Sequence, residues 1–116
     1  MQSYKNEIRK LLHLLASEEE QLNYERNVPH VDITTELLCM WFDDFYDEEQ
    51  VASDPEFTPS EREALATFHQ FYNARSELLP ESQGTVRTWL ATPEWREVME
   101  QARGTLDQIK GHPAGT

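Results

Sequence analysis

The spacing of apolar residues restricts the fold of this 116-residue sequence more than any other feature. Apolar side chains recur every three or four residues in four runs, which cover residues 4–22, 34–46, 58–78 and 95–109. This period of about 3.6 residues is typical of α-helices with one buried face. No segment shows the sustained two-residue alternation of a half-buried strand. The sequence therefore predicts an all-α fold.

Capping residues, prolines and glycines set the expected helix boundaries. We expect a long helix over about 4–25 with Ser3 as its N-cap, and a second helix that begins near Thr34 after the break at Pro29. Residues 47–57 are expected to form a polar connection. A Thr-Pro-x-Glu capping box at Thr58 predicts the start of the third helix, whose buried face would include Leu78.

Two more helices are expected in the last third of the chain. A short one covers "TVRTWLA", after Pro80 and Gly84, and the last begins at Thr92-Pro93. Gly111 and Pro113 would end it, which leaves residues 110–116 as a loose tail. The sequence thus predicts one domain over 1–116, a bundle of four main helices plus one short helix.

The net charge restricts the classes of partner. Ten Lys and Arg stand against 22 Asp and Glu, for a net charge of −12. Such a field repels nucleic-acid phosphates and anionic membranes, and it attracts basic proteins. No apolar run approaches the roughly 20 residues that span a bilayer, and "MQSYKNEIRK" has no apolar stretch of the signal-peptide type. With a single cysteine, Cys39, expected to be a buried structural thiol, these features predict a soluble cytoplasmic protein.

The negative charge is concentrated in one part of the chain. Residues 36–63 hold ten acids and a single base, Arg62, for a net charge of −9. A second acidic cluster consists of Glu18, Glu19 and Glu20, whereas basic residues are interleaved with acids in the C-terminal third. A uniform solubilising coat would spread the charge more evenly. The pattern therefore favours a polarised, interaction-bearing surface.

Known catalytic and metal-binding patterns are missing from the sequence. There is no phosphate-binding glycine loop, C-x-x-C or H-E-x-x-H motif, and the four histidines share no metal-ligand spacing. "DDFYDEEQVASD" has Phe45 at the third position of an EF-hand loop and no glycine at the sixth. Asp43 and Asp44 are adjacent and would diverge on a helix, so they make a poor catalytic pair. We therefore expect no enzyme activity, no metal and no cofactor, and His69 is expected to be a partly buried structural residue.

Acids and aromatic rings alternate in "CMWFDDFYDEEQ", residues 39–50. Trp41 and Phe45 are expected to anchor the segment in the core, which would hold the acids on a rigid surface. A rigid acidic face flanked by aromatic rings suits protein recognition, because carboxylates steer a basic partner and aromatic rings supply buried contact area. The alternative is an amphipathic helix with a solvated acidic side.

Two stretches carry a resemblance to a known class of proteins. "LLASEEEQLNYERNVPHVDITTELLCMWFDDFY" and "FTPSEREALATFHQFY" resemble small acidic bacterial immunity proteins of contact-dependent growth inhibition and related polymorphic toxin systems. The similarity covers about residues 10–75. It implies a non-enzymatic inhibitor that binds a cognate toxin C-terminal domain, often a basic nuclease, in the cytoplasm. The expected contacts are Asp43, Asp44, Asp47, Glu48 and Glu49, with Tyr46 and Phe42 as anchors, and Glu18, Glu19 and Glu20 as a second patch.

Two other binding interpretations stay open at the level of sequence, and a small enzyme with an unrecognised site is a third alternative, which the missing motifs disfavour. An acidic mimic of nucleic acid would bind a different basic protein, with its carboxylates spread along an elongated surface. A helical scaffold or homo-oligomer would bury Phe42 and Tyr46 against a copy of itself. Trp89 and Trp95 fit either the core or an interface.

Overall fold

The computed structural model describes residues 3–28, 32–80 and 85–109, which form seven α-helices, one π-helical segment and no strand. The predicted all-α class is confirmed, but the elements are shorter and more numerous than four main helices and one short one. They are α1 (Tyr4–Ala16), α2 (Glu18–Asn27), α3 (Ile33–Cys39), η1 (Met40–Phe45), α4 (Glu48–Ser53), α5 (Pro59–Ser76), α6 (Val86–Leu90) and α7 (Pro93–Gln108).

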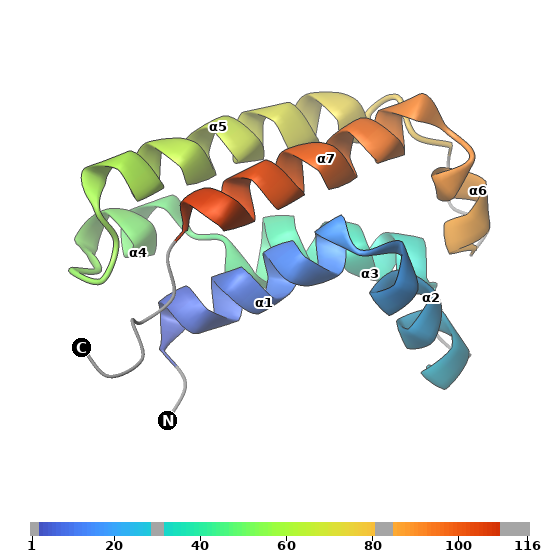
Figure 1. The fold of residues 1–116 in the computed structure, drawn as a ribbon, viewed down its shortest axis with the longest axis horizontal. Helices are drawn as coiled ribbons and strands as arrows, with labels where there is room; N and C mark the ends of the chain where they lie inside the picture. The colour runs from blue at the N-terminus through green and yellow to red at the C-terminus, as the bar shows by residue number, and fades with distance from the viewer. Residues whose placement is uncertain (1–2, 29–31, 81–84, 110–116) are drawn as a thin grey trace.

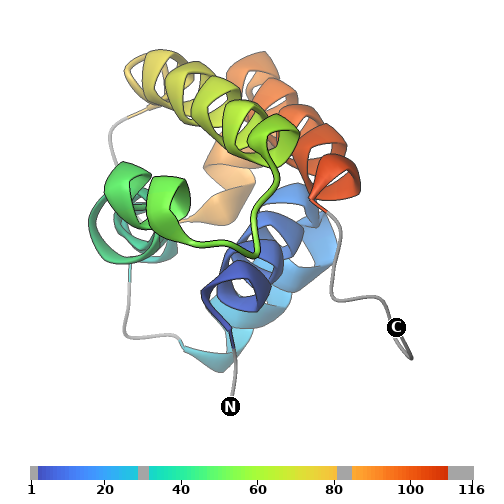
Figure 2. The same cartoon turned by 90° about the vertical axis from the view of Figure 1, so that its left-hand side faces the viewer.

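Two layers of helices enclose the core. α5 and α7 lie side by side in one layer, and α1 and the α3–η1 segment form the other (Figure 1 and Figure 2). α7 packs against both α1 and α5, and these are the two most extensive contacts between helices. The short helices cover the ends, with α2 and α6 at one end and α4 at the other (Figure 1). The buried apolar residues of both layers form one cluster.

A chain of aromatic rings runs through this core. Trp41 meets Phe68 edge-on, with ring centroids 4.9 Å apart, and Phe68 and Tyr72 follow at 5.6 Å. Tyr72 then contacts Trp95 at 6.0 Å, and Trp95 contacts Trp89 at 4.7 Å. Trp89 and Trp95 are 2% and 0% exposed, so both tryptophans belong to the core and neither is available to a partner.

The single long N-terminal helix predicted from the sequence is wrong, because the chain breaks at Ser17. Ser17 has extended backbone geometry, and its hydroxyl accepts a hydrogen bond from the Glu20 amide at 3.1 Å, so it caps α2. The buried Gln21 side chain donates to the carbonyls of Leu14 and Leu15 at 3.0 and 3.1 Å. Side chains thus satisfy backbone groups on both sides of the break.

The second predicted helix also differs from expectation. It begins at Ile33, one residue before the expected start, because the Asp32 carboxylate caps it by accepting from the Thr35 amide at 3.3 Å. It then changes from α to π geometry at Met40 and ends at Phe45. The expected polar connection over 47–57 contains a further helix, α4.

The remaining helix starts agree with the sequence. The hydroxyls of Ser3, Thr58 and Thr92 cap α1, α5 and α7, and Thr58 forms the expected reciprocal box with Glu61. The placement of Leu78 on the buried face of α5 is wrong. The helix ends at Ser76, and Leu78 is 61% exposed beyond it, while Leu79 turns inward. The predictions for Pro29, Gly84, Gly111, Pro113 and the tail 110–116 lie outside the described residues.

Candidate functional site

The structure brings the main group of predicted acidic residues together on one exposed turn. η1 and the start of α4 carry these acids, every one of them is exposed, and none forms an ion pair with another described residue. They are Asp43, Asp44, Asp47, Glu48 and Glu49, which we call the acidic elbow. Carboxylates without counter-charges keep their full field, so the elbow is strongly attractive to a cation.

A π-helical turn positions the first two of these acids. The Tyr46 amide donates to the Trp41 carbonyl at 3.1 Å, a bond that spans five residues instead of four. Trp41 is fully buried, and its Nε1 donates to His69 Nδ1 at 3.1 Å. Because π-turns are rare and occur often at functional sites, this turn marks η1 as a candidate site on grounds independent of charge.

The Tyr4 hydroxyl holds the junction between η1 and α4. It donates to the Phe45 carbonyl at 2.6 Å and accepts from the Asp47 amide at 3.0 Å. Burial raises the pKa of Tyr4, so the phenol stays protonated and keeps its donor at neutral pH. A residue of α1 thereby fixes the direction in which the chain leaves η1.

α4 depends on one of the predicted site residues. The Asp47 carboxylate accepts from the amides of Glu49 and Gln50 at 3.0 and 3.3 Å, which caps the helix. Glu48 and Glu49 lie in the first turn, where the helix dipole favours negative charge. The polar connection predicted over 47–57 is wrong at α4, because a run of acids is typical of a connection, whereas Asp followed by acidic residues is also a helix-start signal.

The predicted aromatic anchors are packed against the protein on one side. The Tyr46 ring stacks on Trp41 and on His69, with ring centroids 4.9 and 4.8 Å away, and burial raises the pKa of its phenol. Phe42 contacts His69 at 5.4 Å and Tyr72 at 4.9 Å. Both rings are half-buried, so each has only part of its surface left for a partner. His69 is half-buried beneath them, which agrees with a structural role.

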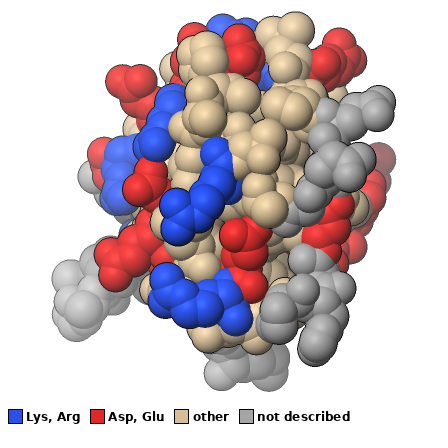
Figure 3. All heavy atoms as spheres, turned by 90° about the vertical axis from the view of Figure 1, so that its right-hand side faces the viewer, with Lys and Arg blue, Asp and Glu red and all other residues tan. Residues whose placement is uncertain are grey.

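The second predicted patch lies elsewhere. Glu18, Glu19 and Glu20 form the first turn of α2, at the end of the molecule opposite α4 (Figure 1). Glu18 pairs with Arg96 of α7 at 2.9 Å, and Glu20 contacts His13. Basic side chains lie among the acids on this end of the surface (Figure 3). The structure therefore does not join this patch to the acidic elbow.

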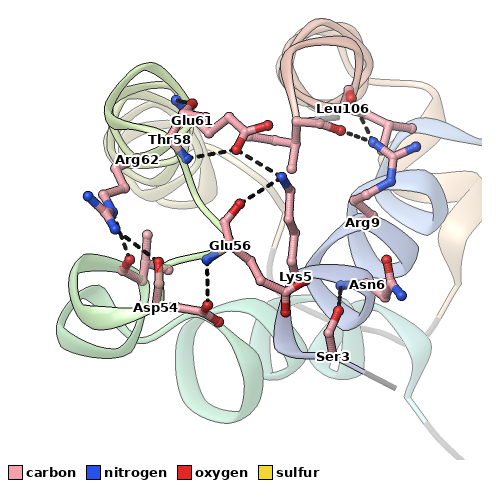
Figure 4. A network of polar contacts seen from close by, with 12 residues as sticks. Ser3, Lys5, Asn6, Arg9, Asp54, Glu56, Thr58, Glu61, Arg62 and Leu106 are labelled. Atoms are coloured by element: carbon pink, nitrogen blue, oxygen red, sulfur yellow. Dashed lines mark hydrogen bonds and ion pairs between the residues drawn. The ribbon is translucent and has the colours of Figure 1, made fainter. Parts of the chain in front are cut away.

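Two basic side chains near α4, Arg62 and Lys5, donate to backbone carbonyls. Arg62 donates from Nε to the Val51 carbonyl at 3.1 Å and from Nη2 to the Asp54 carbonyl at 2.9 Å, so it covers the C-terminal end of α4 (Figure 4). Lys5 is buried and pairs with Glu61 at 2.9 Å. These cations support the local fold, and the described structure uses neither to neutralise the elbow.

Two surface hollows that sequence analysis missed lie along α1. One, of about 190 Å³ between α1 and η1, is lined by Glu7, Lys10, Leu11, Leu14, Met40 and Phe45. The other, of about 420 Å³ between α1 and α7, is lined by Asn6, Arg9, Lys10, His13 and Leu106. Only the apolar spacing along α1 hints at the first hollow, because its other wall comes from a distant segment.

The described residues include no group of three or more His, Cys, Asp or Glu side chains placed to hold a metal ion. Cys39 is half-buried, less than expected. Burial, with the neighbouring Asp43 carboxylate, raises the pKa of its thiol, which disfavours the reactive thiolate.

Within the described part of the chain, no helix has both the length and the apolar character needed to cross a membrane. No family model, curated protein or solved structure matches this chain.

Proposed function

We propose that this chain is an immunity protein that binds and neutralises a cognate toxin C-terminal domain, a basic nuclease, through the acidic elbow. The observation that carries the proposal is the set of five exposed carboxylates on a π-turn and a capped helix, none of which forms an ion pair with another described residue. Phe42 and Tyr46, half-buried beside them, supply apolar contact at the edge. The patch at Glu18, Glu19 and Glu20 is a secondary contact.

Electrostatics explain how such a protein inhibits without chemistry of its own. A nuclease needs a positive groove to hold phosphates, and a dense group of carboxylates competes for that groove. Opposite charges also accelerate the encounter between the two proteins. The elbow is held by Tyr4, Trp41 and the cap of α4, so little ordering is required on binding. No catalytic residue, metal or cofactor enters this mechanism, which operates in the cytoplasm.

The arrangement of the acids favours this proposal over the two alternatives. A mimic of nucleic acid requires carboxylates spaced evenly along the length of the molecule, whereas five exposed acids are concentrated within seven residues of η1 and α4. A homo-oligomer formed through Phe42 and Tyr46 requires free aromatic faces, whereas both rings pack on His69. It would also bring two acidic elbows close together.

The experiment begins with the purified chain as bait in lysate from its host, at low salt and at about 0.5 M salt, where exposed charge pairs are screened. The retained proteins are identified by mass spectrometry. We expect the C-terminal domain of a large secreted protein, retained at both salt concentrations. Its cleavage of DNA or RNA should stop when the chain is added. Retention of a chromosomal basic protein, released as salt rises, would instead support the mimic.

A neutralised elbow tests the surface itself. The elbow variant carries Asp43→Asn, Asp44→Asn and Asp47→Asn, and asparagine at position 47 keeps the cap of α4. We expect affinity for the captured domain to fall about tenfold or more, which corresponds to about 1.4 kcal/mol.

A matched control variant removes the same charge from exposed acids outside the elbow. It carries Glu77→Gln, Glu100→Gln and Asp107→Asn. We expect a change of less than about threefold, because distant exposed charges are screened. Equal losses in the two variants would show that net charge, and not the elbow, governs binding.

A further inference from the structure

The hollow between α1 and η1 has the composition of a docking groove. Leu11 and Leu14 of α1 face Met40 and Phe45 of η1 across a space of about 190 Å³. Leu11 is buried, whereas the other three side chains are half-buried and keep part of their apolar surface exposed. Such a volume accommodates a single large apolar side chain.

Charge distinguishes the two borders of this groove. On the η1 side, Asp44 follows Met40 by four residues, so it lies on the same side of that helix. On the α1 side, Glu7 also lines the groove, one turn before Lys10. The acidic elbow continues from Asp44 toward α4. The opposite border is Lys10, which also lines the larger hollow with Arg9 and His13. A basic partner is therefore attracted over η1 and repelled over the α1–α7 side.

We propose that this groove receives an apolar side chain from a basic amphipathic segment of the partner, while lysines or arginines beside that side chain contact the acidic elbow. The proposal rests on the proposed function and adds to it the chemistry and position of the contact. The elbow steers the partner, and the groove supplies the buried apolar contact that lets a complex persist when salt screens the charges.

A second copy of this chain fits the groove poorly. Each copy carries a net charge of −12, and docking at this groove would place another acidic surface beside Asp44 and the rest of the elbow. Like charges brought together at such a contact disfavour association. Charge complementarity thus selects a cationic occupant.

Two helical peptides serve as probes. The first has a stripe of leucines on one face and lysines on the other, and the second has the same lysines with glutamine in place of every leucine. Fluorescence anisotropy measures the affinity of each for the full chain at low salt and at about 0.5 M salt. We expect the leucine peptide to bind more tightly and to lose less affinity as salt rises.

Three variants locate the binding site. Met40→Ala removes one wall of the groove. It should lower the affinity for the leucine peptide about fivefold or more and have little effect on the affinity for the glutamine peptide. Leu22→Ala removes a half-buried leucine at the other end of the molecule and should change neither. Lys10→Glu should raise the affinity for the leucine peptide several-fold, because it replaces a positive charge that repels the peptide's lysines with a negative charge that attracts them.

Several results would overturn the proposal. Equal effects of Met40→Ala and Leu22→Ala would place the contact elsewhere, provided that circular dichroism melts show all variants folded. Weakening by Lys10→Glu would indicate an anion site in the larger hollow. A dimer in size-exclusion chromatography that Met40→Ala dissociates would make a second copy the occupant.

The groove and the immunity function fail in different ways. If a captured toxin domain is inhibited equally well by the wild-type chain and by Met40→Ala, the groove proposal is wrong and the immunity function stands. If the leucine peptide binds as described and no toxin domain is ever captured or inhibited, the groove stands and the immunity function is wrong.

Discussion

At the scale of single residues, the Tyr4 hydroxyl links α1 to the junction between η1 and α4, where the acidic elbow lies. Tyr4→Phe removes its bonds to the Phe45 carbonyl and the Asp47 amide while it keeps the ring. We expect the free energy of unfolding in urea to fall by about 1–2 kcal/mol, because two backbone groups lose their partner. Tyr24→Phe is the control, since the Tyr24 hydroxyl forms no hydrogen bond within the described structure. Equal losses would contradict the role of Tyr4.

The same residue makes stability dependent on alkaline pH. Burial raises the pKa of Tyr4 above its usual value near 10, so the unfolded chain releases the phenolic proton first. The stabilisation is complete below the unfolded pKa and is lost as pH rises through the folded pKa. We expect urea midpoints to fall above about pH 10, and to fall less steeply in Tyr4→Phe. Burial also raises the pKa values of Tyr46 and Tyr72, so these two residues should still cause part of the loss of stability at high pH in Tyr4→Phe.

At the scale of elements, the Gln21 side chain joins the ends of three helices. It donates to the last turn of α1 and accepts from Trp95 Nε1 of α7 at 3.0 Å, and it is fully buried in α2. Gln21→Leu should lower the free energy of unfolding by about 2–4 kcal/mol, because the buried indole donor and two carbonyls lose their partner.

The matched control for this element prediction is Gln101→Leu, an exposed position on α7. Its effect should stay within about 0.5 kcal/mol. Thermal unfolding of both variants provides the comparison. If Gln21→Leu melts with the wild type, the break between α1 and α2 does not depend on this side chain.

Helix ends differ in how far local sequence predicts them. The caps at Ser3, Thr58 and Thr92 act within one turn, so the sequence predicted the helices that they start. The sequence did not predict the break at Ser17, because the residues around Ser17 are good helix formers and glutamine is usually a surface residue. The burial of Gln21 depends on Trp95, which lies 74 positions away.

At the scale of the whole molecule, the polarised charge should make stability depend on salt. A net charge of −12, with −9 over residues 36–63, opposes the compact state through self-repulsion, which salt screens. We expect the melting temperature to rise by about 2–6 °C between 0.01 and 0.5 M NaCl, as for a gain of about 1 kcal/mol. The elbow variant should show a smaller rise than the control variant. Equal rises would mean that the elbow is not the main source of repulsion.

The sequence by itself determined the helical class, the main buried faces, several helix starts and the concentration of acid near residue 45. Each of these depends on residue type and on spacing within a few turns. Only the tertiary structure decided that Trp41, in the π-helical segment η1, donates a hydrogen bond to His69 of α5. It also decided that the acids of α2 lie at the end of the molecule opposite α4, and that Leu14 and Met40 line the same groove. These features depend on contacts between residues far apart in the chain, which local periodicity does not encode.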